Sequence, residues 1–323
     1  MSKSKRLFAG LPLILSAVLK NLALRIGGVS YSSALFNAGT LTLQRVSVSC
    51  IAGFCIYNEG NLRLKNSTVA DGHGPVSYGL LNTNTGTVVV KDTVFSDNYG
   101  IAFWNEGMAT IDTSSFLSNS YDTGLGSMAA IYNEGTLTVT GTQFSNNRSG
   151  SSSAIGNSGT LVLRSSTFSD NGSSYVGGAI SNTGQATIDS CRFFGNFVSA
   201  GYGGGAVFNL GTLTVRSTDF SDNHAASGHG GAVYNGSTGT LTIKLSTLSA
   251  NTAAYGGAIA NGGLSSVFTN HSPNGGTLKI GNSIITNNAA EQHGGGIYKF
   301  GTGTVQIDGS TRVTGNTPDD IFP

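Results

Sequence analysis

Apolar and polar residues alternate in a short motif that recurs along nearly the whole chain. The segment from Gly203 to Asn223, GGGAVFNLGTLTVRSTDFSDN, returns with variations in eleven copies, the first opening near Ser33 and the last closing at Asn316. Within G-T-L-T-V every second residue is apolar, which is the period of a β-strand. Each copy therefore predicts three short strands, over A-I-x, over G-T-L-T-V and over S-T-x-F.

The inward-facing positions of these strands form apolar columns in all eleven copies. One column comprises Leu41, Leu62, Val88, Ala109, Leu137, Leu161, Ala186, Leu213, Leu241, Leu278 and Val305. A second column lies two residues further on, and a third lies in the A-I-x strand. Because each copy must bury its apolar face against the next copy, the pattern predicts a stacked solenoid. The expected fold is all-β, a right-handed parallel β-helix of about eleven coils with three short strands per coil.

Asparagine marks the first ten copies at a fixed place after the A-I-x triplet, and Lys299 takes that place in the eleventh. The series comprises Asn37, Asn58, Asn82, Asn105, Asn133, Asn157, Asn182, Asn209, Asn235 and Asn261. A second series follows S-T-x-F and comprises Asn98, Asn119, Asn147, Asn171, Asn196, Asn223, Asn251, Asn288 and Asn316. We expect these residues at corners, since Asn tolerates positive φ better than most residues. We also expect their amides to pass hydrogen bonds from coil to coil.

The paired motifs G-G-A-I/V and F-x-x-N carry a family resemblance. They stand at Gly177–Ile180 with Phe193–Asn196 and at Gly204–Val207 with Phe220–Asn223, and G-G-A-I recurs at Gly256–Ile259. In tandem, over roughly residues 33–316, they resemble the polymorphic outer membrane protein repeat family. The resemblance implies a pectin-lyase-like β-helix that is secreted or lies on the bacterial cell surface as a passenger or adhesin. The first three copies depart from it because they lack G-G.

The two ends of the chain differ from the repeats. Residues 1–17 place Lys3, Lys5 and Arg6 before an apolar run, which is the layout of a short signal peptide. The same segment also suits a cap over the open end of the solenoid, and both interpretations stay open. We assign residues 18–316 to the β-helix and residues 317–323 to a C-terminal tail. Charged and polar residues from Lys20 onward stop the apolar run short of a membrane span, so no integral membrane segment is expected.

The charge balance and the cysteine count limit the classes of partner and the disulfides that can be expected. The 323 residues carry 17 Lys and Arg against 16 Asp and Glu, a net charge of +1. No basic stripe for a phosphate backbone follows from that balance, so no nucleic-acid partner is expected. Three cysteines cannot build a disulfide framework. Cys50 and Cys55 are close enough in sequence to pair, but buried thiols are the favoured interpretation of Cys55 and Cys191.

Catalysis on a β-helix would need a cluster of carboxylates, either a hydrolase pair or acidic calcium ligands. The best pair is Glu106 and Glu134, in N-E-G turns of neighbouring copies, with Glu59 at the same place two copies before Glu106. Such turns are typical of solvated glutamates, so no catalytic residue is assigned. The G-H-G around His229 resembles one polygalacturonase motif, but the companion Asn-Thr-Asp is absent. His229 and His293 lie too far apart to share a metal ion, and we expect neither metal nor cofactor.

Aromatic residues recur just before the first Asn series, at positions that alternation turns outward. The binding candidates in this column are Phe36, Tyr57, Trp104, Tyr132, Phe208 and Tyr234. Exposed aromatic rings suit sugar rings or a protein partner, whereas cross-strand stacking would merely stabilise the sheet. The one large insertion, residues 262–276, adds Phe268 and His271 as further candidates, because loops on rigid scaffolds often bind ligands.

These features predict a non-enzymatic, adhesin-like or passenger-like protein, secreted or on the cell surface. Its partner would be a polysaccharide or a host or cell-surface protein, bound along the outer face. A polysaccharide lyase or glycoside hydrolase on the same fold is the first alternative, and a structural spacer is the second.

Overall fold

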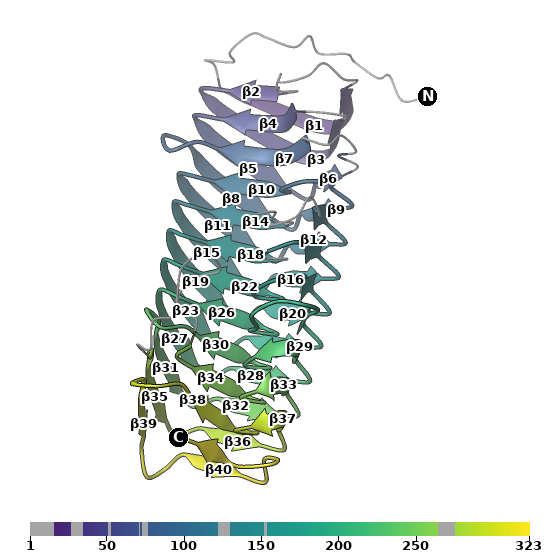
Figure 1. Cartoon of the computed structure of the whole chain (residues 1–323). Helices are drawn as coiled ribbons and strands as arrows, with labels where there is room; N and C mark the ends of the chain where they lie inside the picture. Colours follow the sequence, from purple (N-terminus) through teal and green to yellow (C-terminus); the bar gives the residue numbers. More distant parts are fainter. Residues whose placement is uncertain are drawn as a thin grey trace.

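Parallel strands stack into one straight column that runs from the N-terminal to the C-terminal coil (Figure 1). The computed structural model describes residues 16–26, 35–50, 53–70, 72, 77–121, 130–151, 154–263 and 275–323. Every described strand pair is parallel and joins equivalent positions of successive repeats, as in Phe103↔Ile131. The predicted all-β parallel solenoid and its approximate coil count are therefore confirmed.

Sheet A has twelve strands, eleven built from the A-I-x segments and a last one, β41, built from the final residues of the chain. Its strands are β2 (Leu35–Asn37), β4 (Gly53–Asn58), β7 (Ser77–Asn82), β10 (Phe103–Asn105), β14 (Ile131–Asn133), β18 (Ile155–Asn157), β22 (Ile180–Asn182), β26 (Val207–Asn209), β30 (Val233–Asn235), β34 (Ile259–Asn261), β38 (Ile297–Lys299) and β41 (Ile321–Phe322). Each ends at or beside a marker Asn until β38, where Lys299 takes that place.

Sheet B has 22 strands because two strand series share it. The G-T-L-T-V series is β1 (Ala17–Ile26), β3 (Thr40–Cys50), β5 (Asn61–Lys65), β8 (Thr87–Lys91), β11 (Met108–Asp112), β15 (Thr136–Thr140), β19 (Thr160–Arg164), β23 (Gln185–Asp189), β27 (Thr212–Arg216), β31 (Thr240–Lys244), β35 (Thr277–Gly281) and β39 (Thr304–Ile307). The S-T-x-F series is β6 (Thr68–Ala70), β9 (Val94–Ser96), β12 (Ser115–Leu117), β16 (Gln143–Ser145), β20 (Thr167–Ser169), β24 (Arg192–Phe194), β28 (Asp219–Ser221), β32 (Thr247–Ser249), β36 (Ile284–Thr286) and β40 (Arg312–Thr314).

Sheet C was not predicted. It adds a fourth short strand to seven coils: β13 (Ser120–Tyr121), β17 (Arg148–Ser149), β21 (Gly172–Ser173), β25 (Phe197–Val198), β29 (His224–His229), β33 (Thr252–Tyr255) and β37 (Ala289–His293). Four of these strands have only two residues, which is too short to show an alternating pattern.

The inward columns fill a continuous apolar interior. Its most regular part is a stack of phenylalanines, whose ring centroids lie 4.5–5.0 Å apart with planes within 9° of parallel. The stacked residues are Phe95, Phe116, Phe144, Phe168, Phe193 and Phe220. The spacing follows from the parallel ladder, which sets neighbouring strands about 4.8 Å apart.

Both asparagine series form the predicted amide ladders. In the first, each Nδ2 donates to the Oδ1 of the next coil over 2.6–2.8 Å, from Asn37 to Asn261. In the second the distances are 2.8–3.0 Å, from Asn98 to Asn316. The buried amides thereby find hydrogen-bond partners inside the protein, with the exception of the Asn98 Oδ1 atom at the start of the second series.

The expected backbone role of the ladder asparagines is wrong. None of them has positive φ; that conformation belongs to two other corner columns, for example Asn66 (φ 49°) and Asp97 (φ 54°). Asp97, Asp170 and Asp222 all precede the second ladder in this way. The ladder asparagines are therefore selected for their side chains and not for φ.

The first and last described segments are integrated into the stack. Residues 1–15, which hold most of the predicted signal peptide or cap, lie outside the residues that the structure describes. β1 pairs with β3, so an additional coil begins at Ala17. Residues 317–323 are not a free tail, because β41 pairs with β38 and the Asp320 carboxylate accepts from Asn316 Nδ2 at 2.9 Å. That carboxylate gives the second ladder its final acceptor, which explains why the last residues fold back onto the coil.

The cysteines correct one further expectation. Cys50 and Cys55 form a disulfide with a Cα–Cα distance of 5.3 Å, so Cys55 is not a free thiol. Cys191 is the buried free cysteine that the sequence predicted. Burial raises the pKa of its thiol to about 11, so it is inert as a nucleophile at neutral pH.

Candidate binding face

The predicted aromatic column on the outer face of sheet A divides into two parts. Tyr57, Trp104 and Tyr132 are half-buried, as is Phe36 at the N-terminal end. Phe208 and Tyr234 are 6% and 0% exposed. The structure therefore contradicts the predicted exposure of these last two residues and leaves the first four accessible.

A local cluster covers the two buried rings. Phe208, Tyr234 and Ala260 pack together, with the Phe208 and Tyr234 centroids 5.2 Å apart, and Tyr202 packs against them. The His229 ring lies 5.9 Å from that of Tyr234. Burial raises the pKa of Tyr234 and lowers that of His229 to about 4. His229 ends β29 of sheet C and Tyr202 lies between strands, so alternation within the strands of sheet A does not predict this cover.

In the first five coils the aromatic residues form a continuous surface that we call the aromatic ladder. It consists of Phe36, Phe54, Tyr57, Tyr78, Trp104 and Tyr132, and consecutive ring contacts span 4.8–5.8 Å. The sequence analysis missed Phe54 and Tyr78. Both stand four residues before a ladder asparagine, where later copies carry the second glycine of G-G. The aromatic residue in place of that glycine is the sequence signal that identifies Phe54 and Tyr78 as part of this surface.

Ring orientation separates the two interpretations of the aromatic ladder. Phe36–Tyr57 and Phe54–Tyr78 stack with planes 19° apart, so these rings use their faces on one another. The Trp104 ring is tilted by 59° from Tyr78 and by 54° from Tyr132. Cross-strand stabilisation therefore accounts for the stacked pairs. Neither neighbour lies parallel over the indole, which makes Trp104 the best-placed ring for a ligand.

Glutamates border the exposed end of the aromatic ladder. The Glu134 carboxylate accepts from Trp104 Nε1 at 3.0 Å and from the Tyr132 hydroxyl at 3.1 Å. Burial and the neighbouring charge of Glu134 raise the pKa of Glu106. Burial, Glu59 and Glu106 raise the pKa of Tyr57. One side of the aromatic ladder is thus lined with negative charge.

This arrangement is poorly suited to acid–base catalysis. Asn105 and Asn133 are register partners, so Glu106 and Glu134 follow each other in adjacent coils about 4.8 Å apart along the axis. That coil spacing is compatible with the separation of about 5–5.5 Å between the carboxyl groups of a retaining hydrolase. However, both oxygens of Glu134 already accept hydrogen bonds from the aromatic ladder, and that carboxylate is exposed. Glu134 is therefore held as an acceptor beside the rings.

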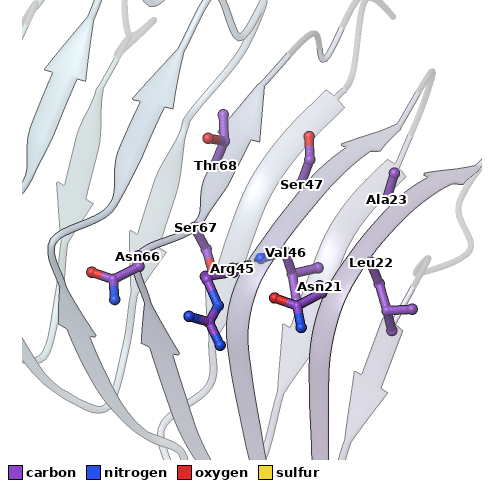
Figure 2. Close-up of a pocket in the computed structure, with 9 residues that line it drawn as sticks. All are labelled: Asn21, Leu22, Ala23, Arg45, Val46, Ser47, Asn66, Ser67 and Thr68. Carbon is purple, nitrogen blue, oxygen red and sulfur yellow. Dashed lines mark hydrogen bonds between the residues drawn. The ribbon is translucent and has the colours of Figure 1, made fainter. Parts of the chain in front are cut away.

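A shallow hollow of about 410 Å³ lies away from this face, at a corner of sheet B. It is lined by Asn21, Leu22, Ala23, Arg45, Val46, Ser47, Asn66, Ser67 and Thr68. Figure 2 shows Asn21, Arg45 and Asn66 on neighbouring coils, and all three have positive φ. The lining contains no carboxylate or histidine, so the hollow offers no acid–base pair.

Two predicted binding residues belong to the insertion at residues 262–276. Phe268 and His271 lie outside the residues that the structure describes. In the described part of the chain, no three His, Cys, Asp or Glu side chains come together to hold a metal ion. Among the same residues, no helix is long and apolar enough to cross a bilayer.

The coils and their paired strands define a parallel β-helix protein. The family model described as "Right handed beta helix region" matches residues 29–193 and 99–317, two overlapping segments that together span most of the chain. The chain therefore belongs to this family, and the right-handed, pectin-lyase-like form of the helix is supported. No curated protein and no solved structure matches the chain significantly. The family establishes the fold, and the surface residues must indicate the activity.

Proposed function

We propose that this protein is a non-enzymatic extracellular β-helix that binds a polysaccharide along the aromatic ladder of sheet A. The observation that carries the proposal is the tilted, half-buried Trp104, whose indole is fixed by Glu134 and has no parallel partner ring among the described residues. Amphipathic rings with a fixed polar edge suit sugars, which present both apolar ring faces and hydroxyl groups. The rigid stack holds such a surface ready for binding, which reduces the entropic cost of association.

Two observations support a secreted or cell-surface location. The Cys50–Cys55 disulfide is typical of oxidising compartments and uncommon in the cytosol. The tandem G-G-A-I/V and F-x-x-N motifs resemble the polymorphic outer membrane protein repeats, which implies an adhesin or passenger role. A protein partner on the same face, or a role as a spacer, would use the solenoid differently and is separated by the experiment below.

One observation favours a second function, glycoside hydrolysis. Glu106 has a raised pKa beside a second carboxylate, and a raised pKa is what a general acid requires. Hydrolysis would shorten the polysaccharide, whereas binding would leave its length unchanged.

The test incubates the purified full chain with a panel of acidic, neutral and basic polysaccharides and records both retention and chain length. We expect retention without shortening on at least one member, and loss of that retention in Trp104→Ala. Phe194→Ala is the matched control, since Phe194 is a half-buried outward ring on β24 under the Arg192 guanidinium. Shortened chains would overturn the proposal in favour of hydrolysis. Absence of retention on every member would overturn it in favour of a protein partner or a spacer.

A further inference from the structure

The charge along the aromatic ladder has one sign. Its strands β2, β4, β7, β10 and β14, with the described turns that follow them, hold Glu59, Glu106 and Glu134 and contain no Lys or Arg. Ion pairs among the described residues lie elsewhere, at Lys91–Asp112, Arg192–Asp219 and His293–Asp319. Among the described residues of this face, the carboxylates of the aromatic ladder therefore have no counter-charge.

That lack of counter-charge is most costly at Glu106, which is half-buried, whereas Glu59 and Glu134 are exposed. Glu106 and Glu134 occupy adjacent coils and repel each other, and the raised pKa of Glu106 reflects both its burial and this repulsion. A cation placed between them would relieve the repulsion at both carboxylates. The same cation would lie beside the Trp104 ring, since the indole Nε1–H donates to Glu134, and a sugar that carries the cation could pack on the indole face.

The geometry also limits what kind of chain can carry the cations. Every ladder strand from β4 to β14 is paired on both sides within sheet A, so its backbone is not free to add a peptide strand. Glu59 and Glu106 lie two coils apart and Glu106 and Glu134 one coil apart, in a line along the axis. An extended polymer with regularly repeated charges, lying parallel to that axis, would match both the rings and the carboxylates.

We infer that the ligand of the aromatic ladder is a cationic polysaccharide, a chain of amino sugars with free amines, whose rings pack on Trp104 and whose ammonium groups pair with Glu106 and Glu134. This inference rests on the proposed polysaccharide-binding function and specifies its ligand class. Acidic polysaccharides are disfavoured on this face by charge, and neutral ones would leave its carboxylates unpaired.

The probes are three hexasaccharides that differ in charge: glucosamine hexamer, N-acetylglucosamine hexamer and cellohexaose. Binding to the full chain is measured by calorimetric titration near pH 6, where the amines are charged. We expect the glucosamine hexamer to bind about tenfold or more tightly than the other two, and its affinity to fall as salt rises, because screening weakens charge pairing. The double variant Glu106→Gln with Glu134→Gln should bring its affinity down to that of cellohexaose. Glu291→Gln, an exposed glutamate on β37, is the matched control.

The outcomes separate the inference from the function on which it rests. Equal binding of all three hexamers, with loss in Trp104→Ala, would overturn the cationic ligand and leave polysaccharide binding intact. Absence of binding by all three, together with no Trp104-dependent retention on the wider panel, would overturn both. Hexalysine binding as tightly as the glucosamine hexamer, with no effect of Trp104→Ala, would show simple charge attraction and overturn the inference. A thermal melt of each variant confirms that it is folded.

Discussion

The outer face of sheet A is built in two ways along one molecule. In the N-terminal coils, Phe54 and Tyr78 stand four residues before a ladder asparagine and extend an accessible row of rings. In the C-terminal coils the same place carries the second glycine of G-G, and aromatic residues such as Tyr234 are buried beneath a cover. One repeat thus carries an accessible row of rings in the N-terminal coils and a self-packed face around Tyr234 in the later coils.

The backbone at G-G explains why the C-terminal coils do not carry aromatic residues at this place. Gly204 has φ +72°, a conformation that side chains disfavour. A Cβ on the adjacent Gly205 would lie 2.2 Å from the carbonyl oxygen of Gly231 in the next coil. The close approach of coils at G-G therefore excludes the aromatic side chains that the N-terminal coils carry at this place.

The largest expected effect is on the glycine itself. Gly205→Ala should destabilise the protein by about 3–5 kcal/mol, because the methyl group collides with backbone that cannot move without separating two coils. At the equivalent N-terminal place, Phe54→Ala removes one stacked ring from a half-buried site and should cost only about 1 kcal/mol. Denaturant titration of both variants measures the difference. Equal losses would show that the two faces are not built differently.

Tyr234 and Tyr132 occupy equivalent positions of the outward aromatic column, and their replacement should change the free energy of unfolding by amounts that differ almost as much. Tyr234→Ala empties a fully buried site and should cost about 3–5 kcal/mol of unfolding free energy. Tyr132→Ala, at a half-buried site, should cost about 1 kcal/mol or less and should instead weaken polysaccharide retention. Thermal melts and retention assays on both variants check this reversal. Loss of retention in the folded Tyr234 variant alone would show that the polysaccharide binds the C-terminal coils, which would contradict the prediction.

Acid should destabilise the C-terminal cluster through His229. Its folded pKa of about 4 lies below the ordinary 6.5, so the unfolded chain binds the proton more readily between these values. The contribution is fully present above about pH 6.5 and is lost as the pH falls towards 4, by about 2–3 kcal/mol in total. His229→Gln should flatten this part of the stability profile. A profile unchanged by the substitution would exclude His229 as the cause.

The smallest expected effect is the pH dependence of stability that comes from Glu106. Its sign is opposite to that of His229, because stability falls and does not rise as the pH increases. The pKa of Glu106 is raised in the folded state, so the folded protein binds the proton more readily than the unfolded chain. Stability from this site should therefore decline slightly as the pH rises through the carboxyl range, by less than about 1 kcal/mol because the site is partly solvated. The free energy of unfolding of Glu106→Gln and of the parent chain, each measured at pH 4 and pH 7, isolates the contribution of Glu106. A decline of equal size in the variant would assign it to other groups.

The sequence predicts those features that repeat in every coil. Period-two alternation is sufficient to place the inward columns, and the recurrent asparagines are sufficient to anticipate both amide ladders. What it misses depends on contacts between unlike segments. The cover over Tyr234 and Phe208 comes from His229 in sheet C and from Tyr202 between strands, and the two-residue strands of sheet C are too short to carry a pattern. Trp104 was named from the column, but its tilt and its bond to Glu134 depend on rotamers that spacing does not determine.

The measurement that tests the account most directly compares one ring from each half. Trp104→Ala and Tyr298→Ala remove half-buried outward rings of sheet A from β10 and β38, and both are assayed for retention on the polysaccharide panel under conditions where they are folded. The account predicts that retention is lost in the Trp104 variant and kept in the Tyr298 variant, with polysaccharide length unchanged throughout. Retention kept by the Trp104 variant, or lost only in the Tyr298 variant, would contradict it.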